Sequence, residues 1–228
     1  MDDVRVAQGT IVVYSDVACR WSTIAVHRLL QARRRLGLDE DVHLEHRLFS
    51  LEDSARAPLS RRTYDVELAA AATVVPELHW HAWSGDPEAF PVTSLLANEA
   101  VCAVRHQGSD AAEELDMALR QAFFRDGACI SLRHVVLDVA EDCLRVDAGM
   151  LEKALDEGSA RGEMMAEYHR SRLRVRRSPH LFLADGYEVV SPGLDVSWVD
   201  GPDGYPVVEA EYPGVFDGLL RRAAARPA

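Results

Sequence analysis

The amino-acid sequence predicts an α/β fold in which an N-terminal strand–helix–strand unit is separated from a later β-hairpin and helix by a helical insertion. Residues 10–16 and 42–49 have the composition and alternation of strands, and residues 19–38 between them carry apolar positions at helical spacing. Residues 63–174 contain no convincing strand pattern. Residues 178–190 then hold two short apolar runs around Asp185-Gly186, a strong hairpin signal.

The first three elements are joined by short links. Trp21, Ile24 and Leu29 lie on one face of the predicted helix, and Gly37 is placed to end it. A strand, a helix and a strand with short connections form a βαβ unit, so we expect the two strands to be parallel and the crossover to be right-handed.

The insertion is predicted to be all-helical, with helices at residues 66–78, 91–108, 109–125, 132–143, 147–155 and 159–173. Residues 79–87 form an aromatic-rich loop, and the Gly/Pro-rich residues 191–206 carry no predicted element. Residues 214–225 form a closing amphipathic helix. We therefore expect a sheet-containing domain, residues 1–62 and 175–228, and a helical insertion domain, residues 63–174.

Composition narrows the class of protein. The 228 residues are 48% hydrophobic and 27% charged, as in ordinary globular domains. The net charge of −12 disfavours nucleic acid and anionic membranes as partners. No stretch approaches the roughly 18 apolar residues of a membrane span, and the acidic start resembles no signal peptide, so a cytoplasmic protein is expected.

The four cysteines, Cys19, Cys102, Cys129 and Cys143, are widely spaced. In a reducing compartment this favours free thiols over a disulfide framework. No two have the spacing of a zinc site, and no metal is expected. His79-Trp80-His81 has no evident third ligand, so an exposed aromatic loop is favoured there over a metal site.

Cys19 is the candidate reactive group because it lies where a strand passes into a helix. A helix N-terminus offers unpaired N–H groups and positive dipole charge, which lower a thiol pKa from about 8.5 to between roughly 3.5 and 7.5. Ser22 occupies the fourth position of Cys19-Arg20-Trp21-Ser22, and its hydroxyl is expected to donate a hydrogen bond to the sulfur. A dithiol cycle between positions 19 and 22 is excluded, which leaves monothiol exchange or activation of a bound thiol.

Ser178-Pro179 directly precedes the predicted strand at residues 180–183. Together with the Cys19 segment, and with residues 93–108, 119–131 and 151–155, it makes the chain resemble the DsbA family. Within that family it is similar to the FrnE-like branch, which is related to 2-hydroxychromene-2-carboxylate isomerases and kappa-class glutathione transferases. The resemblance covers roughly residues 10–190.

This resemblance implies a thioredoxin fold with a helical insertion domain between the βαβ unit and the C-terminal β-hairpin and helix. It implies a cis-proline at Pro179 and a substrate groove between that loop and the Cys19 helix. Cys19 and Ser22 would be catalytic. The substrate-binding residues would be Arg20, Trp21, Ser178, Pro179 and His180, with the Ser178 backbone pairing with an extended peptide or glutathione.

The function expected first is a DsbA/FrnE-like thiol oxidoreductase with a monothiol Cys-x-x-Ser site. A glutathione-dependent isomerase or transferase, and a catalytically inactive binding protein, are the alternatives. No tightly bound cofactor is expected, and glutathione is the candidate if one is used. The expected partner is a thiol or disulfide, as a peptide, glutathione or a small molecule. A homodimer stays open.

Overall fold

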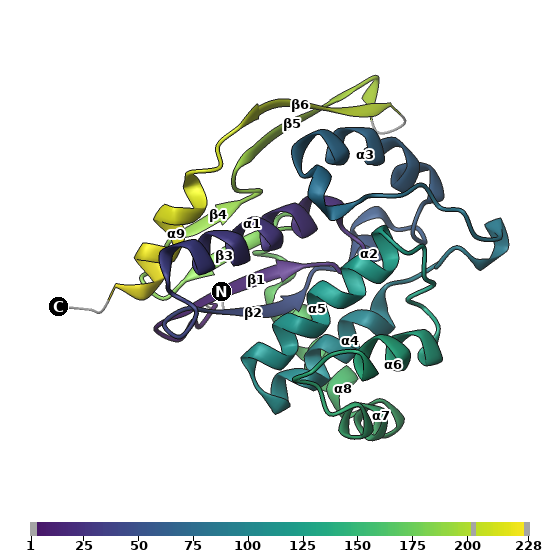
Figure 1. The fold of residues 1–228 in the computed structure, drawn as a ribbon, viewed down its shortest axis with the longest axis horizontal. Helices are drawn as coiled ribbons and strands as arrows, with labels where there is room; N and C mark the ends of the chain where they lie inside the picture. Colours follow the sequence, from purple (N-terminus) through teal and green to yellow (C-terminus); the bar gives the residue numbers. More distant parts are fainter. Residues whose placement is uncertain (1–3, 202–203, 226–228) are drawn as a thin grey trace.

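A computed structural model describes residues 4–201 and 204–225 of the chain. Its central four-stranded sheet has the order β2-β1-β3-β4 (Figure 1). β1 (Thr10–Ser15) pairs in parallel with β2 (His43–Leu48) and antiparallel with β3 (His180–Leu183), and β4 (Glu188–Val190) pairs antiparallel with β3. The predicted βαβ unit with parallel strands and the Asp185-Gly186 hairpin are thus confirmed.

Helix α1 (Arg20–Leu36) forms the crossover between β1 and β2. Cys19 is its N-cap, and Gly37 ends it with φ of 65°, a left-handed conformation that a side chain would disfavour. Arginines at positions 33–35 lie in its last turn, where positive charge complements the helix dipole. Local sequence therefore sets both ends of the helix that carries the reactive cysteine.

The sheet is covered differently on its two faces because successive strand residues point to opposite sides. Ile11 and Val13 pack with Leu29 of α1 and with Phe216 of α9 (Val215–Ala224). Val12 and Tyr14 face the other way and pack with Phe182, among others. Figure 1 shows α9 beside α1, so the closing helix completes the layer that supports the Cys19 helix.

The middle of the chain is helical, and no strand occurs between residues 63 and 174. The short helix α2 (Leu51–Ala55) precedes this part of the chain. Its own α-helices are α3 (Arg61–Val74), α4 (Leu95–Val104), α5 (Ser109–Phe124), α6 (Arg133–Glu141), α7 (Ala148–Glu157) and α8 (Ser159–Ser171). Short 3-10 turns occupy Pro76–Leu78, Pro87–Ala89 and Arg105–Gln107.

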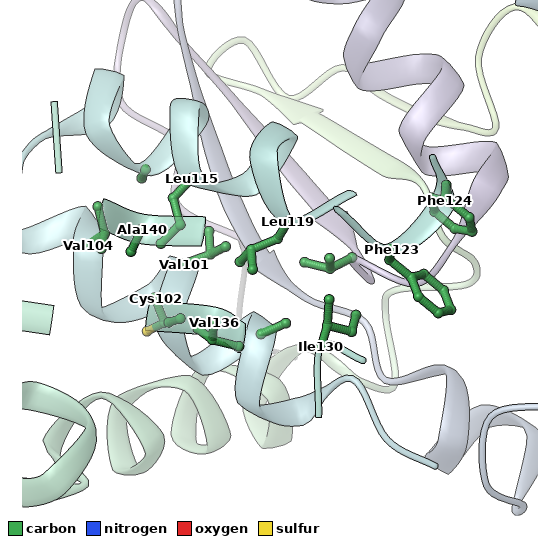
Figure 2. Packing of buried hydrophobic residues seen from close by; sticks show 14 of the residues in the cluster. Val101, Cys102, Val104, Leu115, Leu119, Phe123, Phe124, Ile130, Val136 and Ala140 are labelled. Carbon is green, nitrogen blue, oxygen red and sulfur yellow. The ribbon is translucent and has the colours of Figure 1, made fainter. Parts of the chain in front are cut away.

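One hydrophobic cluster fills this helical block. Figure 2 shows Val101 of α4, Leu115 and Leu119 of α5 and Val136 of α6 gathered around its centre. The same cluster includes Ile24 of α1. A core shared with the Cys19 helix ties the insertion to the sheet-containing part, while the proposed domain boundaries stay a prediction.

Residues 191–206 were expected to carry no regular structure, and this expectation was wrong. β5 (Leu194–Val199) and β6 (Tyr205–Glu211) form a second, antiparallel two-stranded sheet with an irregularity between Asp195 and Val196. It lies over α3 in Figure 1. Residues 202–203 of the expected stretch lie outside the described residues.

Among the described residues, we find no helix that is both long and apolar enough to cross a membrane.

Candidate functional site

Cys19 lies at the junction predicted from sequence, on a turn built by Asp16. The Asp16 carboxylate accepts hydrogen bonds from the backbone N–H of Ala18 at 2.9 Å and of Leu51 at 3.1 Å. The Asn98 side-chain amide donates to the same carboxylate at 3.3 Å. Asp16 is completely buried, so its role is to organise the loop that delivers Cys19 to the start of α1.

The Cys19 sulfur lies against the loop that precedes β3. The thiol donates to the carbonyl oxygen of Ser178 at 3.4 Å, and the Ser178 hydroxyl accepts from the Asp16 N–H at 3.1 Å. The Ser178–Pro179 peptide bond is cis. Two segments that are 159 residues apart in sequence therefore meet at the sulfur.

A cavity of about 390 Å³ opens beside this junction. Cys19, Trp21 and Ser178 contribute to its wall, and the remaining wall comes from α2, α3, the end of α5 and loops between elements. Its apolar lining includes Phe49, Leu51, Pro58, Leu59, Phe90, Phe123 and Phe124, and its charged lining includes Arg20, Glu52, Glu67, Arg176 and Arg177. The site is mostly apolar with a few charged groups, as small-molecule sites usually are.

The expected lowering of the Cys19 pKa was wrong. Cys19 is only 5% exposed, and burial raises the pKa of its thiol because the thiolate loses hydration. The Glu67 carboxylate raises this pKa further, while hydrogen bonds with Ser178 and Ser22 act in the opposite direction and are outweighed. Cys19 is therefore a neutral thiol in the unliganded protein.

The Ser22 hydroxyl has further contacts besides the expected one with the Cys19 sulfur, which contributes to lowering the Cys19 pKa. The hydroxyl is within hydrogen-bond distance of the Cys19 carbonyl, at 2.9 Å, and the Asp16 carbonyl, at 3.1 Å. It accepts a hydrogen bond from Arg120 Nη1 at 2.8 Å. The Ser22 backbone N–H also donates to the Cys19 sulfur, at 3.5 Å. The hydroxyl is thus part of the scaffold beneath the sulfur.

Arg120 is the centre of that scaffold, and it was missed in the sequence. Its guanidinium is fully buried, donates to Ser15 Oγ at 2.9 Å and to Thr23 Oγ1 at 3.1 Å, and pairs with Asp116 at 2.7 Å. The available signal was an Asp–Arg pair at i, i+4 on an otherwise apolar helix face. Arg120 fixes the insertion helix α5 to the start of α1.

Trp21 and Arg20 follow Cys19 but point to different surroundings. Trp21 is half-buried at the cavity, and its indole Nε1 donates to the Glu67 carboxylate at 2.9 Å. Arg20 is completely buried. Its guanidinium lies 4.2 Å from the centre of the Tyr64 ring and 4.6 Å from that of Phe124, and it donates to the Tyr64 carbonyl at 3.0 Å.

Arg20 also belongs to the cavity wall, so its expected contact with substrate stays a prediction. The guanidinium is enclosed by aromatic faces, which attract a cation, so it anchors α3 and α5 to α1.

Pro179 has the expected cis peptide bond, and His180 follows it as the first residue of β3. Both are buried, and neither lines the cavity. The His180 ring centre is 4.2 Å from that of Phe182, its Nδ1 accepts from the Arg176 N–H at 3.3 Å, and burial lowers its pKa to about 4. His180 belongs to the sheet packing, because its position in β3 turns the side chain inward.

The aromatic loop at residues 79–87 does not form an exposed cover. Trp80 and Trp83 are buried in the insertion core, and Trp80 Nε1 donates to the Val75 carbonyl at 2.7 Å. Within the described residues, His79 and His81 join no group of three or more side chains able to hold a metal ion. All four cysteines are free thiols, and Cys19 alone among them lines the cavity.

The fold and the Cys19 junction define a thioredoxin-fold protein with a helical insertion, and the sequence profile of the DSBA-like thioredoxin domain matches residues 10–185. The chain therefore belongs to the DSBA-like thioredoxin domain family. No curated protein matches its sequence.

Three solved structures show the same fold at low sequence identity. The probable DsbA oxidoreductase SCO1869 from Streptomyces coelicolor has a TM-score of 0.66 and 17% identity, over 96% of this chain and 92% of that one. The cytosolic disulfide reductase DsbM from Pseudomonas aeruginosa has a TM-score of 0.59 and 17% identity, over 93% and 97%. A 2-hydroxychromene-2-carboxylate isomerase has a TM-score of 0.59 and 18% identity, over 79% and 87%.

A second structure of DsbM, with GSH, matches with a TM-score of 0.52 and 13% identity, over 93% of this chain and 97% of that one.

Proposed function

We propose that this protein is a monothiol oxidoreductase that exchanges Cys19 with a small disulfide, and that glutathione supplies the second thiol. The observation that carries the proposal is the sulfur of Cys19, the only cysteine lining the cavity within the described residues, in contact with the Ser178 carbonyl. Ser22 leaves no resolving thiol at the fourth position. A cysteine so placed needs its second sulfur from solution.

The exchange balances in three steps. The Cys19 sulfur attacks one sulfur of the disulfide, a Cys19–substrate disulfide forms, and the other half leaves as a thiolate. A glutathione thiolate then attacks the substrate sulfur of this mixed disulfide. That attack releases Cys19 and a mixed disulfide of glutathione with the substrate. A second glutathione thiolate then attacks the glutathione sulfur of this mixed disulfide, which gives glutathione disulfide and the second substrate thiol, so two electrons pass from two glutathione thiols to the substrate disulfide.

The charge of the cavity rim supports glutathione as a ligand. Arg176 and Arg177 are exposed and line the cavity beside Ser178. Arg176 pairs with Glu188 at 3.5 Å, while Arg177 has no hydrogen bond or ion pair within the described residues. An arginine fork binds carboxylates well, and glutathione carries two. A structure of DsbM, a structural neighbour, contains GSH. A cytoplasmic location, where glutathione is reduced, is part of the same proposal.

A glutathione-dependent isomerase or transferase is the second candidate. It is favoured by the raised pKa of Cys19, because a neutral thiol can hydrogen-bond a glutathione thiolate instead of attacking. One structural neighbour is named as a 2-hydroxychromene-2-carboxylate isomerase.

Turnover of a small disulfide separates these candidates. The reduced protein, bis(2-hydroxyethyl) disulfide and glutathione are mixed, and formation of glutathione disulfide is followed with glutathione reductase and NADPH. We expect turnover that is lost in Cys19→Ala and kept in the control Cys129→Ala, since Cys129 does not line the cavity. Equal rates in the wild type and Cys19→Ala would rule out the oxidoreductase and leave the transferase or a binding protein.

A further inference from the structure

Two carboxylates line the cavity within the described residues, Glu52 and Glu67. Glu52 accepts from the Thr93 hydroxyl at 2.6 Å and from the Ser94 N–H at 2.7 Å, so its position is explained by the loop that it ties down, and Glu67 has no such role.

Glu67 lies on α3 three residues after Tyr64 and four before Ala71, both of which are buried, so it shares the helix face that packs toward α1. Packing faces are normally apolar. A carboxylate there is costly to keep unless something uses it.

The carboxylate is held in place beside Cys19. It accepts a hydrogen bond from Trp21 Nε1 at 2.9 Å, and Trp21 lies in the first turn of the helix that Cys19 caps. Both Glu67 and Cys19 line the cavity. They are close enough for the charge of Glu67 to raise the Cys19 pKa. Within the described residues, Glu67 forms no ion pair, so its negative charge is not neutralised by contact.

Burial is the main influence on the Glu67 pKa, and the charged groups around it have smaller effects. Burial raises its pKa to about 7, and the hydrogen bond from Trp21 and the Arg20 charge lower it only in part. The other charged groups around the cavity are Glu52 of α2 and Arg176 and Arg177 before β3. A proton acceptor works best when its pKa is near the working pH, which Glu67 satisfies.

We propose that Glu67 accepts the thiol proton of Cys19 when substrate fills the cavity. This inference rests on the proposed thiol exchange. As the new sulfur–sulfur bond forms, the proton passes from Sγ to the Glu67 carboxylate and the leaving thiolate departs. When the second thiol frees Cys19 as a thiolate, the Glu67 carboxyl returns the proton, so the protein ends the cycle unchanged.

Proton transfer from Cys19 to Glu67 is favourable because the total charge of these two side chains does not change. In the occupied cavity, a thiol that loses its proton to solvent must place a new negative charge in a site without water. If the proton moves to Glu67, the pair carries one negative charge before and after the transfer. An extended substrate that donates to the Ser178 carbonyl also displaces the thiol hydrogen, which now occupies that carbonyl.

The test is Glu67→Gln, because the amide oxygen can still accept the Trp21 hydrogen bond while the basic group is lost. In the disulfide turnover assay at saturating substrate and pH 7, we expect kcat to fall about 100-fold, the lower end of general acid–base effects. Asp65→Asn is the matched control, since it removes a charge from the same helix at an exposed ion pair with Arg61. It should keep wild-type kcat.

Alkylation of the unliganded protein by iodoacetamide gives the second measurement, resolved at the peptide that contains Cys19. Removing the Glu67 charge lowers the Cys19 pKa, so alkylation of Glu67→Gln should be as fast as in the wild type or faster. Slow turnover with unimpaired alkylation is the signature of a lost acceptor. The wild-type kcat should also show an ionisation near pH 7 that the variant lacks.

Two results would overturn the assignment. Unchanged kcat in Glu67→Gln would make Glu67 only an acceptor for the Trp21 indole, and a raised kcat would make it only a charge that disfavours the thiolate. Either result leaves the proposed thiol exchange intact, provided that Cys19→Ala is inactive. If the wild-type protein itself shows no turnover, that result counts against the thiol exchange and not specifically against the role of Glu67.

Discussion

At the scale of single residues, the site depends on which atoms of Ser22 meet the sulfur. The backbone N–H donates to Cys19 Sγ, while the hydroxyl accepts from the buried Arg120. The contact of the backbone N–H with the sulfur can be predicted from sequence, because Cys19 lies at a helix start. The contact of the hydroxyl depends on Arg120, which is 98 positions away, and no local sequence pattern reveals it.

Ser22→Ala tests this division of roles. Loss of the hydroxyl removes one of three oxygens that accept from Nη1 of buried Arg120, and the Asp16 carbonyl and Thr23 Oγ1 remain as acceptors. We therefore expect the free energy of unfolding to fall by about 0.5–1.5 kcal/mol, the net value of one hydrogen bond. Cys19 alkylation at pH 8 should slow only slightly, because the Ser22 hydroxyl lowers the Cys19 pKa less than the backbone N–H does, and the N–H remains. Urea unfolding measures the free energy of unfolding, and alkylation resolved at the Cys19 peptide measures the reactivity of the thiol. Ser84→Ala, at an exposed loop position, is the control.

The opposite pattern, unchanged stability with much slower alkylation, would show that the hydroxyl acts on the sulfur as the sequence suggested.

The Cys19 pKa illustrates why the sequence misjudged the chemistry. The helix N-terminus was recognised correctly, and its N–H does reach the sulfur. Burial against the Ser178 loop and the nearby Glu67 charge both act against the thiolate. Those two effects come from tertiary structure, and they outweigh the local dipole, which is a modest effect.

At the scale of elements, the sequence pattern of β3 predicted the strand correctly but not the role of its His180 side chain. The Ser178-Pro179 step and the following strand were placed correctly. His180 was assigned to the groove because of its position after the proline, yet its side chain packs on Phe182 inside the molecule. The buried ring has a pKa of about 4, which has consequences for stability.

We expect His180 to make stability depend on pH between about 4 and 6.5. In this range the unfolded chain binds a proton at His180 and the folded protein does not, so stability falls as the pH falls. The lowered His180 pKa corresponds to a loss of about 2 kcal/mol in the free energy of unfolding across this range, with relaxation around the charged ring taken into account. The free energy of unfolding in urea should therefore drop more between pH 7 and pH 4.5 for the wild type than for His180→Gln.

An equal drop in both proteins would assign the pH dependence to other buried groups, such as His46, whose pKa burial also lowers.

The β5–β6 hairpin is the element that the sequence reading missed. Its strands alternate apolar and polar residues, as in Leu194, Val196 and Trp198, but glycines and prolines around them outweighed this pattern. Pro206 is tolerated because it lies in a two-stranded sheet, near the end where β6 begins. A short alternating run beside turn residues therefore deserved a strand assignment.

At the scale of the whole molecule, the insertion is not a separate appendage. Buried Arg20 reaches from α1 to the rings of Tyr64 and Phe124, and buried Arg120 reaches from α5 to the loop before α1. These two arginines and a shared hydrophobic cluster connect the helices to the Cys19 junction. The sequence predicted the order of the parts, but the cavity between them depends on long-range packing.

If Cys19 is the cysteine that exchanges with disulfides, glutathione disulfide should modify it selectively. The fully reduced protein is incubated with glutathione disulfide at pH 7, quenched in acid and digested, and the peptides are weighed by mass spectrometry. We predict one glutathione, bound through a disulfide to the peptide that contains Cys19, and its release by fresh glutathione. An unmodified Cys19, or glutathione found mainly on Cys129, would contradict this expectation.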